Sequence, residues 1–186
     1  MHPDVNELRQ LPRINDDILA IFSSRRITTI RELQELPATK FDALFGRRFG
    51  EEKAEIKHVL QSLPIFELKA FFCKCSLRET DCISDGGVIS CNASSGELEV
   101  SIRLLRGNPK MKIHAPKYHK AKVATYWLIV DAGQSLLYCR RIDASKSESK
   151  FKLPIDRLPT DGSVIHAEIV SDSMMGISFS FSCNIY

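Results

Sequence analysis

The sequence predicts an α+β protein in which a small all-α domain, residues 1–63, precedes an all-β sandwich, residues 64–186. Three observations predict it. Apolar residues of the first third recur at helical spacing between residues that cap helices. After Leu63-Pro64 the apolar residues alternate, and β-branched and aromatic residues become common. Short apolar runs then fill about 120 residues, separated by glycine-containing turns, as is typical of a β-sandwich.

The helical domain begins with a helix within Ile14–Arg26. Asn15 can cap this helix, because its side chain accepts a hydrogen bond from a free backbone amide of the first turn. Ile18, Leu19 and Phe22 follow helical spacing and predict one apolar face.

A proline divides the rest of the helical domain. Residues 29–32, Thr-Ile-Arg-Glu, have the spacing of a capping box and predict a helix that Pro37 ends. A short turn from Thr39 is expected next, and the clearest helix, Glu51–Ser62, comes last. Two acids favour its start, and its apolar face is expected to hold Ala54, Ile56, Val59, Leu60 and Leu63.

The β domain is predicted as seven strands and a weaker one, Val88–Cys91. Asp131–Gln134 joins two strong strands and is the best hairpin turn. The seven strands are Ile65–Cys75, Leu98–Leu104, Ala124–Val130, Ser135–Arg141, Phe151–Leu153, Val164–Ser171 and Ile177–Ile185. This pattern predicts an immunoglobulin/fibronectin-III-like sandwich. Its core is expected to hold Leu68, Ile102, Trp127, Ile129, Leu137, Ile169 and Phe179, with Trp127 between the sheets.

Composition excludes several classes of protein. With 44% hydrophobic and 26% charged residues, the chain can build packed cores and is not disordered by composition. A formal charge of +3 is too mild to indicate nucleic-acid binding by itself. No run approaches the roughly 18 apolar residues of a membrane span, and the N-terminus has no apolar signal segment. We therefore expect an intracellular protein whose six cysteines are reduced and mostly buried.

The motifs of enzymes are missing from the sequence. It has no phosphate-binding glycine loop, no GxSxG turn and no HExxH pair. Cys73, Cys75, Cys82 and Cys91 are spaced unlike the ligands of zinc sites. No histidine has a nucleophile and a carboxylate at a recognisable spacing. We therefore expect no catalytic site, no metal site and no cofactor.

The most unusual segment runs from Lys110 to Lys122. It holds five lysines and two histidines and no acid, which suits contact with phosphates or with an acidic protein face. The alternative is a solvated loop between two strands, as most charge runs are. Arg47-Arg48, in a glycine-containing turn, form a second basic spot with the same alternatives. Against nucleic acid, residues 1–63 carry ten basic and ten acidic side chains, so their net charge is zero.

Four segments together resemble a known family. Ala115–Lys122 followed by Tyr126–Asp131 resembles the Sec-sixty-three homology module of the Ski-two-like helicases, and most of all that of the spliceosomal unwinding and signal-cointegrator helicases. Leu63–Leu68 is similar to the family's junction between helices and sandwich. Ser135–Ile142 is similar to the next strand with its basic end, and Ser171–Gly176 to the turn before the final strand.

The chain also departs from the family pattern. Tyr126 replaces the first tryptophan of the usual pair, Met174 stands where an aromatic is expected, and His119 replaces a common proline. Neither helicase motor domain is present, nor is the module's long helical bundle. The resemblance therefore implies no ATPase activity in this chain; a parent helicase would be the ATPase.

The resemblance implies a helicase-associated, helix-hairpin-helix and immunoglobulin-like module that docks partner proteins and regulates the motor. It implies a nuclear location and partners among helicase motor domains and factors of mRNA splicing or recombination, with no membrane. The alternative is an auxiliary nucleic-acid-binding module of a meiotic crossover helicase. Candidate contacts to partners or nucleic acid are Arg47, Arg48, Lys110, Lys112, Lys117, Tyr118, Lys120, Lys122, Arg140 and Arg141.

Overall fold

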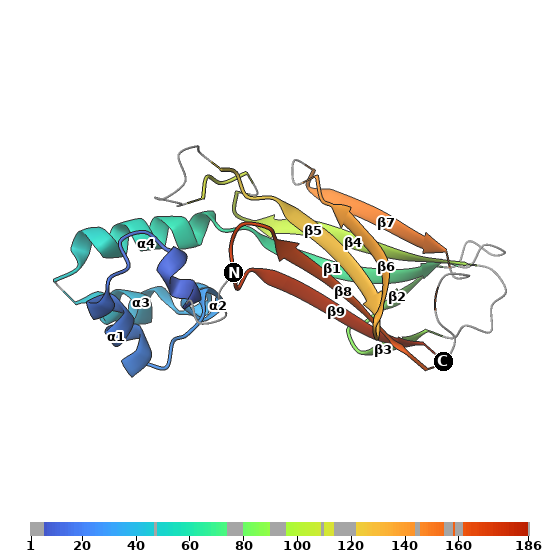
Figure 1. Ribbon diagram of the computed structural model, residues 1–186, viewed down its shortest axis with the longest axis horizontal. Helices are drawn as coiled ribbons and strands as arrows, with labels where there is room; N and C mark the ends of the chain where they lie inside the picture. The colour runs from blue at the N-terminus through green and yellow to red at the C-terminus, as the bar shows by residue number, and fades with distance from the viewer. Residues whose placement is uncertain are drawn as a thin grey trace. The chain divides into compact units, whose positions relative to one another are not determined.

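The protein is α+β, as the sequence predicts, and most of its secondary structure is β. A computed structural model describes residues 6–46, 48–73, 80–89, 96–108, 110–113, 122–143, 146–154, 158 and 162–185. These residues form a 3-10 helix, four α-helices and nine strands in two sheets (Figure 1). The helical elements are η1 Glu7–Gln10, α1 Asp16–Ser24, α2 Ile30–Glu35, α3 Ala38–Phe45 and α4 Gly50–Ser62.

The chain divides into two compact units. The helical unit consists of Met1–Leu63 together with Gly107–Ala124 and Ser173–Ile177. The β unit consists of Pro64–Arg106, Thr125–Asp172 and Ser178–Tyr186. The chain first passes from one unit to the other between Leu63 and Pro64, and two later segments return to the helical unit. The division into domains 1–63 and 64–186 stays a prediction.

Side-chain hydrogen bonds cap the N-terminal ends of the first two α-helices. The Asn15 side chain accepts a hydrogen bond from the backbone amide of Ile18, 2.9 Å away, and caps α1. Thr29 and Glu32 form the reciprocal capping box at the start of α2. Both caps were predicted from the sequence and are confirmed.

The turn expected from Thr39 is instead part of α3. Pro37 ends α2 and also stands at the N-cap of α3, because a proline is tolerated where a helix begins and has no amide to satisfy. Phe41 and Phe45 of α3 are buried, and Phe45 packs edge-on against Phe22 of α1 with ring centroids 5.7 Å apart. This aromatic cluster makes α3 a packed helix of the unit.

The strands form two sheets. The four-stranded sheet has the order β2-β1-β4-β7, and the five-stranded sheet has the order β3-β9-β8-β5-β6. All pairings are antiparallel except β3 with β9. The strands are β1 Ile65–Cys73, β2 Thr80–Ile83, β3 Gly87–Ile89, β4 Glu97–Arg106, β5 Tyr126–Ala132, β6 Ser135–Arg141, β7 Glu148–Pro154, β8 Val164–Ser171 and β9 Ser178–Ile185.

Aromatic contacts join the two sheets, which lie one over the other in Figure 1. Phe66 of β1 packs against Tyr126 of β5 and Phe179 of β9, with centroids 5.1 and 5.7 Å apart. Tyr138 of β6 meets Phe151 of β7 at 6.0 Å. The buried residues between the sheets include the predicted Ile102 and Ile169.

The placement of Trp127 in the core was wrong. On β5 the buried residues are Tyr126, Leu128 and Val130, whereas Trp127 is 37% exposed and Ile129 is half-buried. Every residue from 126 to 130 is apolar, so the sequence alone does not show which of them point inward. Neighbouring side chains of a strand point to opposite faces. An error of one residue in the predicted orientation therefore exchanges all the inward side chains for the outward ones.

In the β unit, one predicted hairpin is confirmed and one strand was not predicted. The Asp131–Gln134 hairpin is confirmed: β5 pairs antiparallel with β6, and Gly133 takes φ +62° in the turn between them. Strand β2 was not predicted. It pairs with the end of β1 at an edge of the four-stranded sheet, where little apolar patterning is required.

Candidate interaction surfaces

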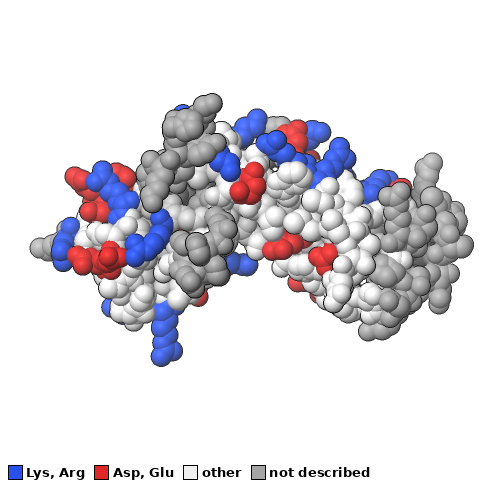
Figure 2. Space-filling model, in the orientation of Figure 1, with Lys and Arg blue, Asp and Glu red and all other residues white. Residues whose placement is uncertain are grey.

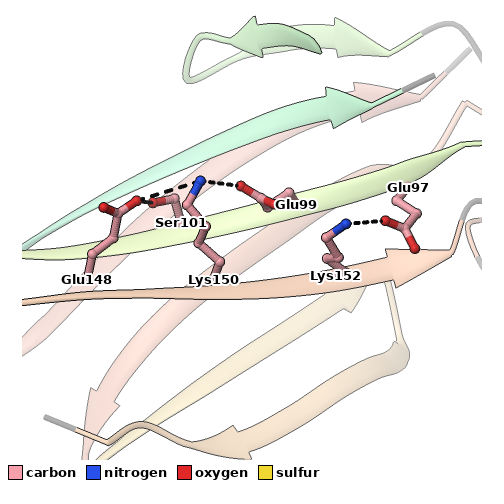
Figure 3. A network of polar contacts seen from close by, with 6 residues as sticks. All are labelled: Glu97, Glu99, Ser101, Glu148, Lys150 and Lys152. Carbon is pink, nitrogen blue, oxygen red and sulfur yellow. Dashed lines mark hydrogen bonds and ion pairs between the residues drawn. The ribbon is translucent and has the colours of Figure 1, made fainter. Parts of the chain in front are cut away.

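The outward face of the four-stranded sheet carries a charge ladder, formed by Glu97, Glu99, Ser101, Glu148, Lys150 and Lys152 (Figure 3). Lys150 Nζ lies 2.9 Å from Glu99 Oε1, and Lys152 Nζ lies 2.7 Å from Glu97 Oε2. The Ser101 hydroxyl donates a hydrogen bond of 3.0 Å to Glu148. Both lysines of the ladder are therefore paired with carboxylates across β4 and β7.

Electrostatics reinforces the ladder. The hydrogen bond and charge of Glu99 raise the pKa of Lys150 above its usual range, and Glu97 raises the pKa of Lys152 in the same way. Lys150 also lies 6.0 Å from the centre of the Phe71 ring. Surface pairs such as these contribute little stability each, but they give both lysines of β7 a carboxylate partner on β4.

The outward face of the five-stranded sheet has a different chemistry. Register places Trp127 between Arg141 of β6 and Val170 of β8, and Ile129 between Cys139 and Glu168. Trp127, Cys139 and Arg141 are exposed, and Ile129 and Val170 are half-buried. These five residues, Trp127, Ile129, Cys139, Arg141 and Val170, are called the Trp127 face. It combines an exposed indole, aliphatic neighbours and one cation on paired strands.

The candidate residues Arg140 and Arg141 end strand β6. Arg141 belongs to the Trp127 face, whereas the register places Arg140 opposite Leu128, on the other side of the sheet. Arg140 lies 3.5 Å from the Tyr138 hydroxyl, and this contact raises the pKa of the guanidinium. The structure therefore separates the two arginines, and only Arg141 joins Trp127.

Tyr126, next to Trp127, is buried between the sheets. Its hydroxyl has no hydrogen-bond partner among the described residues. Burial raises the pKa of this phenol above its usual range, and the charge of Asp172 adds to the effect. An unpaired buried hydroxyl costs stability, so Tyr126 fills space in the core at an energetic cost.

The two ends of the basic segment lie side by side in the helical unit. Lys112 forms a β-bridge with Val123, and the Ile113 amide donates to the Lys122 carbonyl at 2.9 Å. Lys110, Lys112 and Lys122 are exposed, and no ion pair reaches them within the described part of the chain. Met111, between the first two lysines, is buried.

Those ends border a groove of about 480 Å³. The exposed side of α4 supplies Ala54 and Val59, which the sequence places on the apolar face of the helix. Met111, Ile113 and Met174 add further apolar side chains, and the remaining lining residues are Gln10, Pro12, Glu55, His58 and Lys112. The apolar face of α4 is therefore only partly covered.

The remaining candidates are placed as follows. Arg47, Lys117, Tyr118 and Lys120 lie outside the described residues. Arg48 is exposed, but its guanidinium pairs with Asp17 at 3.2 Å and stacks over Phe49 at 5.0 Å. Basic and acidic side chains are interspersed over the helices on the face that Figure 2 shows. The helical unit thus presents no single-sign surface on that face.

Three further features concern metal ligands, membrane helices and cysteines. The described residues contain no group of three or more His, Cys, Asp and Glu side chains placed to hold a metal ion. None of the helices described combines the length and apolar character needed to cross a membrane. Cys183 is buried, whereas Cys82 and Cys139 are exposed, so the expectation of mostly buried cysteines does not hold for these two.

Comparison with known proteins gives no family. No protein-family model matches the sequence, and no curated protein matches it.

Most of the Trp127 face was not predicted from the sequence. Arg141 was expected as a contact, but Trp127 and Ile129 were expected in the core. The charge pattern of β6 gave one usable indication, because exposed arginines at a strand end mark an accessible edge.

Proposed function

We propose that the chain is a non-catalytic docking module of a nucleic-acid helicase. In this proposal a helix-hairpin-helix-like domain is followed along the chain by an immunoglobulin-like sandwich. The chain would belong to the Sec-sixty-three homology family and work in the nucleus, in mRNA splicing or a related unwinding process. Helicase motor domains and splicing or recombination factors are the proposed partners.

The Trp127 face is the observation that carries the proposal. Tryptophan, tyrosine and arginine are the side chains enriched at energetic hot spots of protein interfaces. Trp127, Ile129 and Val170 form such a surface on a sheet, with Arg141 at its rim. A monomer gains nothing from leaving an indole exposed, whereas a docking module can bury it in a partner.

Nucleic acid is the weaker candidate. Arg48 is neutralised by Asp17, and the described residues around Trp127 include Glu168, which would repel phosphates. Lys110, Lys112 and Lys122 are the cations that remain available for an auxiliary nucleic-acid contact.

Calorimetric titration tests the proposal with a defined partner, the two motor domains of a Ski-two-like helicase from the same organism. We expect wild-type chain to bind, and Trp127→Ala to weaken binding by about thirtyfold, as expected for loss of a hot-spot side chain of about 2 kcal/mol. Val88→Ala is the matched control, because Val88 is an exposed apolar residue on β3, at the other edge of the same sheet.

Two results would overturn this function. One is the absence of a complex, or a complex that Trp127→Ala and Val88→Ala leave equally unchanged. The other is tight binding of single-stranded RNA that falls steeply with salt and is lost in a Lys110→Glu, Lys112→Glu, Lys122→Glu variant.

A further inference from the structure

A second surface lies in the helical unit, within a hollow of about 380 Å³. Its lining comes from the end of α1, the end of α2 and one face of α3, and consists of Arg25, Ile27, Leu36, Lys40, Ala43 and Leu44. This set is called the α3 hollow. Its volume falls in the range of about 300–1,000 Å³ typical of ligand pockets.

Local structure explains why the hollow exists. After α1 the chain reverses at Arg26, whose φ is +58°, and the Ile27 amide returns to the Phe22 carbonyl at 2.9 Å. Lys40, Ala43 and Leu44 share one face of α3, because residues three and four apart lie together on a helix. Phe41 and Phe45, on the other side of α3, are buried in the core. The side of α3 that carries Lys40, Ala43 and Leu44 therefore lines the hollow.

The hollow has an aliphatic floor and a cationic rim. Ile27, Leu36, Ala43 and Leu44 are all aliphatic, while Arg25 and Lys40 are exposed at the edge. In the part of the chain that the structure describes, no carboxylate pairs with Arg25 or Lys40. Other cations of the unit do have carboxylate partners, namely Arg9, Arg13, Arg31, Arg48, Lys53 and Lys57.

Lys40 is poorly placed for the stability of its own helix. It lies in the first turn of α3, which has no acidic residue and no side-chain cap. The helix dipole favours negative charge at this end, so a lysine there is unfavourable. A locally unfavourable, unpaired cation beside an apolar hollow is better explained by a ligand than by folding.

We propose that the α3 hollow docks a segment of a partner protein in which acidic residues flank aliphatic side chains. The aliphatic side chain would enter the hollow, and carboxylates beside it would reach Arg25 and Lys40. The described lining offers no aromatic ring on which a base could stack, which favours a peptide over single-stranded nucleic acid. This site goes beyond the proposed function, because it lies in the other unit from the Trp127 face.

Fluorescence anisotropy tests this site with a short labelled peptide in which Glu and Asp flank two leucines. We expect binding that is lost when both leucines are replaced by serine. Lys40→Glu should weaken binding about fivefold, while the melting temperature stays equal or rises because the helix dipole is better matched. Ala43→Leu should weaken binding about tenfold by filling the hollow without a change of charge.

Lys112→Glu is the matched charge control, because it removes another unpaired cation of the same unit and should leave the peptide affinity unchanged. Trp127→Ala should also leave it unchanged, so failure of this site is distinguishable from failure of the Trp127 face. Equal binding of the serine peptide, no binding at all, or equal losses in Lys40→Glu and Lys112→Glu would contradict the proposal. Preferential binding of polyuridine RNA, sensitive to Lys40→Glu, would assign the hollow to nucleic acid instead.

Discussion

The two outward faces of the β unit use the same alternation of side chains for opposite purposes. On the four-stranded sheet, the outward positions of β4 and β7 form the charge ladder, in which Lys150 and Lys152 pair with acids of the neighbouring strand. On the five-stranded sheet, the corresponding positions of β5 hold Trp127 and Ile129. On the first face the lysines are paired with carboxylates of the same sheet, whereas the second face exposes apolar area that a partner could cover. The difference indicates which side of the unit is available for docking.

The largest expected effect is a difference in stability between substitutions of an inward and an outward residue of β5. Leu128→Ala should lower the free energy of unfolding by about 3 kcal/mol, because Leu128 is fully buried and its loss leaves a cavity. Trp127→Ala, one residue away, should cost less, about 1.5 kcal/mol, because its side chain lies on the outward face and is 37% exposed. Urea denaturation measures both. The reverse order would place Trp127 in the core and remove the contrast between the faces.

A smaller effect of opposite sign is expected at Tyr126. Tyr126→Phe should raise the free energy of unfolding by about 1 kcal/mol, because it removes a buried hydroxyl that has no partner among the described residues. Tyr138→Phe is the control and should give no gain, since Tyr138 is only half-buried and its hydroxyl meets Arg140. Chemical denaturation at neutral pH measures the difference. A loss of stability in Tyr126→Phe would show that the hydroxyl makes a stabilising contact.

The pH dependence at Tyr126 has a defined sign. Burial raises the pKa of the phenol in the folded protein, so the fold holds its proton more tightly than the unfolded chain does. This contribution is fully present below the ordinary tyrosine pKa of about 10 and is lost as the pH rises above it. Wild-type protein should therefore lose more stability than Tyr126→Phe between neutral and strongly alkaline pH.

The smallest expected effect concerns the charge ladder. The raised pKa values of Lys150 and Lys152 mean that their contribution is complete below the ordinary lysine pKa of about 10.5 and is lost above it. A Lys150→Met, Lys152→Met variant should lack this alkaline loss and should also lose the weak destabilisation of wild type by added salt. Urea midpoints at low and high salt test both points. Identical salt dependence in the two proteins would show that the ladder contributes nothing measurable.

Features set by a few neighbouring residues were predictable from the sequence. The caps at Asn15 and Thr29 and the hairpin around Gly133 each depend on contacts within a few residues. The helix α3 was missed because Pro37 was interpreted only as the end of a helix, although proline suits a helix start equally well.

Features set by pairing between distant segments were not predictable. The orientation of β5 depends on partners in β6 and β8, because the run from 126 to 130 is apolar on both faces. The charge ladder joins residues about fifty positions apart, so the sequence shows its charges but not their pairing. For the same reason Trp127 was assigned to the core, and the candidate surface was identified only by its arginines.

Fluorine NMR tests the central claim most directly, because Trp127 is the single tryptophan of the chain. Chain labelled with fluorotryptophan should give one resonance that responds to solvent, since Trp127 is exposed in the free protein. Addition of the helicase motor domains should shift that resonance to saturation and shield it from solvent, with the same affinity in a Lys150→Ala variant of the ladder. A resonance that is insensitive to solvent in the free chain, or unchanged when the complex is saturated, would contradict the assignment of this face to docking.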